Sequence, residues 1–383
     1  MSPNSSTDCH RLNQAVLVFS GFNIRAVVAF CRFATRWKIP FHIVAVSEND
    51  PIFQTAYAKH VFLIRDSSEL CDKQVLKWMN EIRTLNRLDR VVVLPTSEYL
   101  NRFLLLHRST FEDAGHVIPL AESSLYDQLS DKKSFAEICQ KHGLGIPREF
   151  DSQPVQLPFV AKPLRYASTK TGKQLKPWLI TNEDEQAEFQ GKEVEADFFF
   201  QEYVQGKSIY LLYYVSSTDS DVCFSQENLI QQSNGGSIVA ARTADAHFAP
   251  VADDYLKMLK SLGFHGVIMV ELKQTNGQYT MIESNPRFWG PIQFVIDQGV
   301  PIVRQFMTEL GFDNMSKCQT VPVPNQDLLY FWSGGISEAA QPLAFHNYTP
   351  DNFSNDYPML ICNDVFLRDD TIELYAQEFR KQQ

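Results

Sequence analysis

Apolar and polar positions alternate in blocks along the first third of the chain. Ala15 to Phe19 is an apolar, β-rich run, Arg25 to Trp37 has apolar residues at helical spacing, and Phe41 to Val46 is a second apolar run of strand length. Strands that alternate with helices in this way predict a parallel sheet. A helix around Lys73 to Asn86 and a strand at Val91 to Pro95 extend the pattern. We therefore predict a small α/β domain.

The turn after the first strand, Ser20 to Asn23, has one glycine and no lysine. It lacks the spacing of a phosphate-binding loop, so a tight strand-to-helix turn is the simpler interpretation. A ligand at the carboxyl ends of these strands stays open, because open parallel sheets bind ligands there.

The later pattern favours strands joined by polar loops. A capped helix is followed by the short strand FVAKP, a polar loop over Arg165 to Pro177, and the strand DFFFQEYV ending at Val204. We predict five regions: a disordered tail (1–14), an N-terminal α/β domain (15–125), two α+β lobes (126–204 and 205–312), and an extension that completes or covers the second lobe (313–383).

Charge and cysteine usage narrow the class of protein. The chain has 383 residues with a formal net charge of −10, which disfavours nucleic acid and anionic membranes as partners. Its seven cysteines form no CxxC pair and are odd in number, so neither a disulfide framework nor a zinc site is expected. No signal peptide or membrane span is evident, and we expect a cytoplasmic protein.

The strongest chemical signal is a predicted hairpin around Asn276-Gly277. Glu271 lies in its first strand and Glu283 in its second, each among apolar neighbours. A two-residue loop would place these carboxylates on opposite faces, whereas a three-residue loop, Thr275 to Gly277, places them on one face. We expect the three-residue loop.

On that register Glu271, Glu283 and the amide oxygen of Asn285 share one face. Such hard oxygen donors suit Mg²⁺, which keeps further sites for water and phosphate. The alternative is a solvated face with two incidental glutamates. Because Glu-x-Asn-Pro-Arg directly follows a matching strand that carries a glutamate, the metal site is favoured.

The segment ESNPRFWG, with Glu271 upstream, resembles the ATP-grasp superfamily over roughly residues 129–309, most closely its carboxylate–amine-ligase and carbamoyl-phosphate-synthase-like branches. The resemblance implies an N-terminal α/β domain before a two-lobed ATP-grasp domain, with ATP and Mg²⁺ (or Mn²⁺) between the lobes. It implies an ADP-forming ligase that activates a carboxylate as an acyl phosphate for attack by an amine or a similar nucleophile.

The resemblance also implies roles for individual residues. Glu271, Glu283 and Asn285 match metal ligands, Arg287 matches the arginine that faces the transferred phosphoryl group, and Lys162 and Lys132 match lysines at the ATP phosphates. Gln201, Glu202, Tyr203 and Val204 match the strand that borders the adenine. Ser208 stands where an acidic residue often holds the ribose, and Ser168, Thr169 and Lys170 could donate to phosphate from a loop poorer in glycine than usual.

Several alternatives stay open. The same fold could serve a small-molecule kinase, an enzyme that forms carboxyphosphate or carbamoyl phosphate, or a nucleotide-binding module without turnover. Asn234 to Ser237 is either a glycine pair near the reaction centre or a plain turn. We expect small carboxylates and amines as partners and leave a homodimer open, while the sequence names neither substrate.

Overall fold

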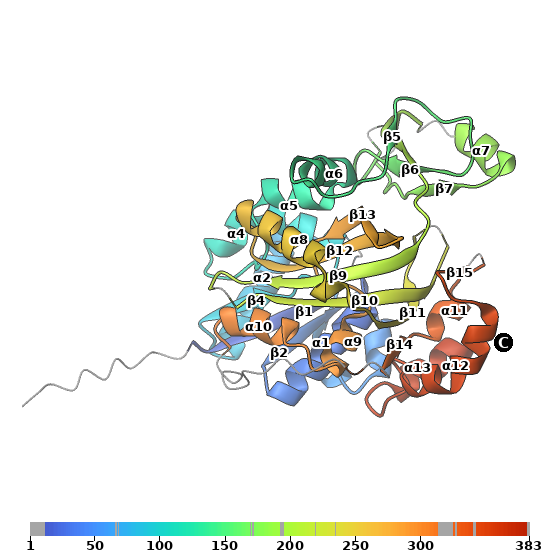
Figure 1. Ribbon diagram of the computed structural model, residues 1–383. Coiled ribbons are helices and arrows are strands. Elements are labelled where there is room, and N and C mark those ends of the chain that lie inside the picture. The colour runs from blue at the N-terminus through green and yellow to red at the C-terminus, as the bar shows by residue number, and fades with distance from the viewer. Residues whose placement is uncertain are drawn as a thin grey trace, which may run out of the picture.

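The computed structural model describes residues 12–380, apart from 66, 68, 169, 171, 192–194, 219, 234, 313–324, 326–327 and 340–341. Most of the predicted disordered tail, residues 1–11, lies outside the described residues, and Gln14 already begins the first strand. Figure 1 shows the chain as a central set of sheets with helices packed around them.

The N-terminal domain is the predicted parallel α/β unit. Its four strands lie in the order β3-β2-β1-β4, and every pairing is parallel. The elements are β1 (Gln14–Phe19), α1 (Ile24–Trp37), β2 (Phe41–Ala45), η1 (Pro51–Gln54), η2 (Ala58–His60), β3 (Val61–Ile64), α2 (Asp72–Leu85), β4 (Arg90–Val93), α3 (Glu98–Leu106) and α4 (Arg108–Glu112). Asn23 caps α1 with its side chain, which fixes the helix directly after the β1 turn.

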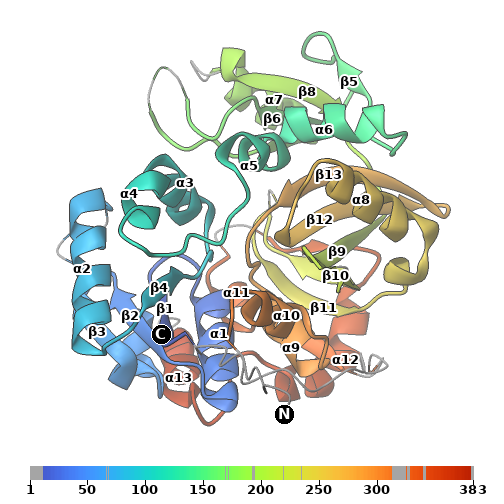
Figure 2. The same cartoon turned by 90° about the vertical axis from the view of Figure 1, so that its left-hand side faces the viewer.

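The first lobe is a small antiparallel sheet of order β5-β8-β6-β7. Its elements are α5 (Ser123–Ser130), α6 (Lys132–Lys141), β5 (Glu149–Phe150), β6 (Phe159–Pro163), β7 (Trp178–Ile180), α7 (Glu183–Gln190), η3 (Glu195–Asp197) and β8 (Phe198–Glu202). A compact set of buried aromatic and aliphatic side chains, including Phe159, Phe189 and Phe200, fills this lobe. Figure 2 shows this sheet above the other two parts.

The second lobe is a larger sheet of order β13-β12-β9-β10-β11-β14, with β15 paired to β10. Its elements are β9 (Lys207–Val215), β10 (Val222–Gln231), β11 (Ile238–Thr243), η4 (Ala246–Phe248), α8 (Pro250–Ser261), β12 (Gly266–Thr275), β13 (Gln278–Asn285), α9 (Ile292–Asp297) and α10 (Ile302–Glu309). Helix α8 covers one face of this sheet with Tyr255, Met258 and Leu259.

The C-terminal segment adds β14 (Leu329–Phe331), α11 (Gly334–Ser337), β15 (Ala344–Phe345), α12 (Pro350–Cys362) and α13 (Ile372–Arg380). Strand β14 pairs with β11 and so extends the second-lobe sheet. Near α13, the Asp370 carbonyl accepts a hydrogen bond from Ala56 of the N-terminal domain. The segment therefore joins the second lobe to the N-terminal domain.

One large apolar core confirms that connection. It includes Val27 and Phe30 of α1, Phe294 of α9 and Phe306 of α10, together with residues from the second-lobe sheet. Burial of this shared core against water joins the N-terminal domain and the second lobe into one packed body. Among the described residues no helix is long and apolar enough to cross a membrane.

Candidate active site

The two predicted metal ligands lie side by side. Glu271 of β12 and Glu283 of β13 are direct cross-strand partners, so their side chains share one face of the sheet. The predicted three-residue loop is wrong, because Thr275 pairs with Gln278 and only Asn276 (φ 51°) and Gly277 (φ 79°) form the turn. That two-residue turn with both φ values positive is the one that suits the twist of a hairpin.

A β-bulge brings the carboxylates together despite the shorter loop. Leu272 pairs with Met281, the next pair is Glu271 with Glu283, and Ile282 is the extra residue between them. A bulge shifts the register by one residue and leaves backbone groups free of the ladder. The Ile282 carbonyl accepts a 2.8 Å hydrogen bond from Nζ of Lys162, which reaches across from β6 of the first lobe.

Lys162 is 6% exposed and carries its charge against two carboxylates. Burial lowers its pKa to about 8, and the neighbouring Lys132 acts in the same direction, while Glu283 and Glu271 oppose the shift. A lysine in this position is charged at neutral pH yet only weakly solvated. It is therefore well suited to contact an incoming polyanion.

Glu283 is held by its neighbours from two sides. Nζ of Lys132, the first residue of α6, donates to Oε2, and Nδ2 of Asn285 donates to Oε1 over 2.9 Å. Burial alone would raise the pKa of Glu283, but the ion pair with Lys132 and these hydrogen bonds outweigh burial and lower it to about 2. Glu283 is therefore ionised at any physiological pH.

Glu271 has the opposite environment. It is 7% exposed, and its main polar contact is a 3.3 Å hydrogen bond from Ser208 Oγ. Burial, and then the charge of Glu283, raise the pKa of Glu271 to about 7. Ser208, expected near a ribose, is fully buried beneath this carboxylate and in turn accepts a 3.1 Å hydrogen bond from Asn228. In this structure it orients Glu271.

Arg287 connects the hairpin to the N-terminal domain. Its Nη2 donates to Asn285 Oδ1 over 2.9 Å and its Nη1 donates to the Phe288 carbonyl over 3.2 Å. Its Nε lies 3.9 Å from Oε2 of Glu98, the first residue of α3. No motif in the sequence pointed to Glu98, because its role depends on how two distant segments pack.

The donor set fits a divalent cation. Two carboxylates on one face are hard ligands of the kind that Mg²⁺ prefers. The Asn285 amide turns its nitrogen to Glu283 and its oxygen to Arg287 here, so its oxygen would join them after the amide rotates. In this structure the ammonium of Lys132 already contacts Glu283, which shows that a cation is accommodated there. Within the described part of the chain no three acidic, histidine or cysteine side chains converge. Glu271, Glu283 and Asn285 are the residues that could hold the metal, because they lie on one face of the hairpin.

Two neighbouring cavities share Glu283, Asn285 and Arg287 in their walls. The smaller, about 200 Å³, is lined by Lys132, Tyr166 and Arg165 of the first-lobe side. The larger, about 630 Å³, is lined by residues after the carboxyl ends of β1 and β4, including Asn23 and Thr96. Glu98, Gln174, Lys176, Pro177, Glu283, Asn285 and Arg287 line both cavities.

The sequence matches no protein-family profile and no curated protein. Solved structures share its fold. The biotin carboxylase domain of 2-oxoglutarate carboxylase from Hydrogenobacter thermophilus, in complex with MgADP, ADP and bicarbonate, has a TM-score of 0.59 and 14% identity, over 82% of this chain and 73% of that chain.

Two further solved structures have a similar fold. N5-carboxyaminoimidazole synthetase from Staphylococcus aureus, complexed with ADP, has a TM-score of 0.55 and 16% identity over 80% of this chain and 79% of its own. N5-carboxyaminoimidazole ribonucleotide synthetase from Thermus thermophilus has a TM-score of 0.55 and 14% identity, over 76% and 78%. The chain has the ATP-grasp fold. The resemblance carried by ESNPRFWG is confirmed at the level of the fold.

Within the ATP-grasp fold, the remaining predicted nucleotide contacts lie around the first lobe. Gln201 is buried in β8, and Glu202 accepts a 2.8 Å hydrogen bond from the Arg148 backbone, while Tyr203 and Val204 begin the segment that leads to β9. This segment is the connection between the two lobes. The Glu202 side chain is already engaged with Arg148, and the adenine contact stays a prediction.

The loop between β6 and β7 lies over both cavities. Its residues Gln174 and Lys176 line them, whereas Ser168 is buried and donates to Asp197 over 2.6 Å. Ser168 therefore holds the loop in shape here, and Thr169 lies outside the described residues.

In the second lobe, Gly235, Gly236 and Ser237 line the larger cavity. The neighbouring Asn234 lies outside the described part of the chain. The glycine pair thus lines the same cavity as Arg287.

Proposed function

We propose that this protein is an ATP- and Mg²⁺-dependent ligase that activates a substrate carboxylate as an acyl phosphate and releases ADP and phosphate. One observation carries the proposal: Glu271 and Glu283 are cross-strand partners with Lys162 and Lys132 beside them, and Glu283 lines both the smaller and the larger cavity. A non-catalytic nucleotide site would not need this full set of charges next to a second cavity.

The reaction has two balanced steps. An oxygen of the substrate carboxylate attacks the γ-phosphorus of ATP, the bond from that phosphorus to the bridging oxygen breaks, and ADP leaves with the electron pair. The amine nitrogen then attacks the acyl carbon, loses a proton, and expels inorganic phosphate. Phosphoryl transfer of this kind depends on positioning and charge stabilisation, which the lysines, Arg287 and the carboxylates can provide.

Each charged residue has a role in this scheme. Lys162 and Lys132 bind the oxygens of the ATP phosphates, and Lys132 leaves Glu283 to do so. Glu271, Glu283 and the Asn285 amide oxygen would hold Mg²⁺, which supplies Lewis-acid stabilisation of the phosphate charge. Arg287 lines both cavities and so can face the transferred phosphoryl group from the substrate side.

We assign the phosphate tail of ATP to the smaller cavity and the acid and amine substrates to the larger one. The smaller cavity lies between Lys132 and the first-lobe loop, which suits the phosphate tail. The adenine would lie against the connection between the lobes, where Gln201, Glu202, Tyr203 and Val204 are placed. The larger cavity has room for the acid and the amine, and the N-terminal domain supplies part of its wall.

A pooled screen tests the proposal. The purified protein is incubated with ATP, Mg²⁺ and sets of organic acids and amino acids, with and without amines, and phosphate and ADP are quantified. Stoichiometric ADP and phosphate with an amide product supports the ligase. A stable phosphorylated product would show a kinase instead, and ATP binding with no turnover in any set would show a binding module.

A further inference from the structure

Arg25 is a second arginine in the larger cavity. It lies in the first turn of α1, is 8% exposed, and lines the cavity together with Arg287. Its Nη1 donates to the Ile238 carbonyl over 2.9 Å and to the Tyr330 hydroxyl over 3.1 Å. Its Nη2 donates to Ser237 Oγ over 2.8 Å. The guanidinium is thus fixed by three neutral acceptors.

The charge of Arg25 is poorly compensated. Among the described residues no carboxylate forms an ion pair with Arg25, which instead lies over the Trp332 ring at 4.1 Å. At the edge of that ring, Oε1 of Glu378 accepts the Trp332 indole N–H over 3.3 Å. Burial raises the pKa of Glu378 to about 7, so this acid is only partly ionised at neutral pH. A buried unpaired charge is costly and is normally met by an anion.

Neighbouring residues leave room for the guanidinium at the cavity. A Cβ atom on Gly290 would lie 2.6 Å from Nη2 of Arg25, so any larger residue there would displace the guanidinium. Gly290 follows Trp289 in the ESNPRFWG segment and lines the same cavity. The Arg25 guanidinium therefore lies where three segments meet: α1, the start of β11, and the segment that follows the β12–β13 hairpin.

We infer that Arg25 binds a second anionic group of the substrate, so that the acid carries two oxyanions, one phosphorylated beside Arg287 and the other held by Arg25 and Ser237. This inference rests on the proposed function for the first anion. The wall of the same cavity includes Phe22, Tyr210 and Met269, which suit a short carbon chain. The second oxyanion is a carboxylate or a phosphate ester.

Binding measurements with matched acids test the inference. The protein is loaded with Mg²⁺ and a non-hydrolysable ATP analogue, and calorimetry compares dicarboxylates from succinate to adipate with monocarboxylates of equal length, and 3-phosphoglycerate with glycerate. We expect at least one dianion to bind roughly 10- to 100-fold more tightly than its matched monoanion, as for a charge-assisted hydrogen-bond pair. The better of the two series identifies the second group as carboxylate or phosphate.

Variants assign the preference to Arg25. Arg25→Gln should remove the preference for the dianion and leave monoanion binding unchanged, and Arg25→Lys, which keeps the buried charge, should reduce it. Arg36→Gln removes an exposed arginine from the same helix and should change neither. Equal binding of every matched pair by the wild type, or an Arg25→Gln protein with the full wild-type preference, would overturn the inference.

Turnover separates this inference from the ligase proposal. If dianions bind through Arg25 but no acid releases phosphate, the ligase proposal fails and the Arg25 site stands. If monoanions and dianions release phosphate with equal kcat/KM, the ligase proposal stands and the Arg25 inference fails.

Discussion

The two carboxylates of the hairpin differ in environment although they are direct neighbours. Glu283 is paired with Lys132 and ionised, whereas Glu271 is buried over Ser208 and has a raised pKa. Two like charges at such close range oppose each other's ionisation. A divalent cation between them would remove that conflict, which is the physical reason to expect metal here.

The first prediction concerns Lys162. Its pKa of about 8 lies below the usual lysine value, so its charge is present below that pH and is lost as the pH rises through it. We expect ATP affinity to fall above about pH 8 in the wild type. Lys162→Met should bind ATP weakly and lack this inflection. Titrations of nucleotide binding between about pH 6.5 and 9.5 measure this pH dependence of the ATP affinity. Lys257→Met, which removes an exposed lysine, is the control.

The second prediction concerns Ser208. Removing its hydroxyl leaves Glu271 without its donor and Asn228 without its acceptor. We expect Ser208→Ala to weaken Mg²⁺ binding by about 10- to 100-fold, since the partners of metal ligands fix their geometry. It should also lower stability by about 1–3 kcal/mol. Unchanged Mg²⁺ dependence of nucleotide binding would show that Ser208 does not support the site.

At the scale of elements, the hairpin shows which structural features could be predicted from the sequence and which could not. Asn276-Gly277 specified the turn, and the β-rich runs specified both strands, because these signals are local. The register prediction failed because the turn has two residues instead of three and because the bulge at Ile282 was not expected. The bulge at Ile282 is stabilised by Lys162 from the other lobe. A contact between residues so far apart in the sequence cannot be predicted from the sequence of the hairpin alone.

The other residues of the candidate site also fall into two groups, those that could be predicted from the sequence and those that could not. Lys132, Lys162 and Arg287 were predictable because they lie in segments that resemble a known family. Arg25 and Glu98 were not, because they come from N-terminal helices whose sequence shows only amphipathic periodicity. Their side chains reach the cavities only through the packing of the N-terminal domain on the second lobe.

The third prediction concerns the connection between the lobes. Gly206 has φ 140°, and a Cβ there would lie 2.4 Å from the Gln274 carbonyl oxygen. Gly263 also has positive φ but faces open space. We expect Gly263→Ala to cost about 1–2 kcal/mol from backbone strain alone, and Gly206→Ala to cost about 1–3 kcal/mol more from the clash. Denaturant unfolding measures both, and equal losses would contradict the clash.

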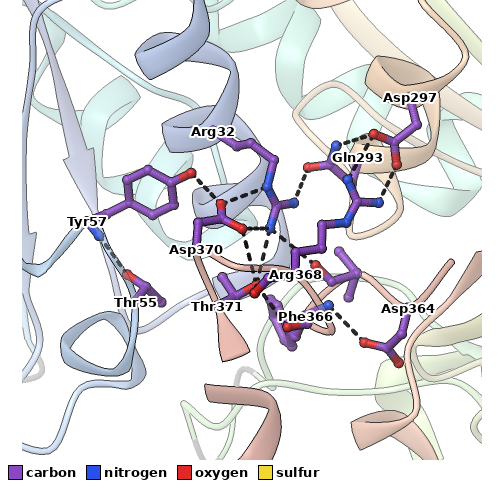
Figure 3. Close-up of polar contacts among 11 residues, drawn as sticks. Arg32, Thr55, Tyr57, Gln293, Asp297, Asp364, Phe366, Arg368, Asp370 and Thr371 are labelled. Atoms are coloured by element: carbon purple, nitrogen blue, oxygen red, sulfur yellow. Dashed lines mark hydrogen bonds and ion pairs between the residues drawn. The ribbon is translucent and has the colours of Figure 1, made fainter. Parts of the chain in front are cut away.

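At the scale of the whole molecule, a polar network fastens the C-terminal segment to the N-terminal domain. Figure 3 shows Arg32 of α1 between Asp370 and Gln293, with its Nε 2.8 Å from the Asp370 carboxylate. The Tyr57 hydroxyl donates to the same carboxylate. Arg368 meets Asp297 of α9 beside them. The network reinforces the apolar core that these parts share.

The fourth prediction concerns this network. Burial would raise the pKa of Asp370, but hydrogen bonds and the charge of Arg32 lower it below its usual value. Its stabilising contribution is therefore present above the unfolded-state pKa and is lost as the pH falls through the native value. We expect Asp370→Asn to lower stability by about 1–3 kcal/mol near neutrality.

Unfolding curves across acidic and neutral pH measure that loss. The difference between Asp370→Asn and wild type should shrink in acid, while the exposed Asp254→Asn should show little difference at any pH. A constant difference at all pH values would exclude the Arg32 ion pair as its source.

The most direct test of the whole proposal is the Mg²⁺ dependence of nucleotide binding in wild type and in Glu283→Gln. Calorimetry with a non-hydrolysable ATP analogue, with and without Mg²⁺, needs no knowledge of the acid substrate. We predict that Mg²⁺ tightens binding in the wild type and that this gain disappears in Glu283→Gln, while the fold persists. An identical gain from Mg²⁺ in both proteins would contradict a metal site on the hairpin.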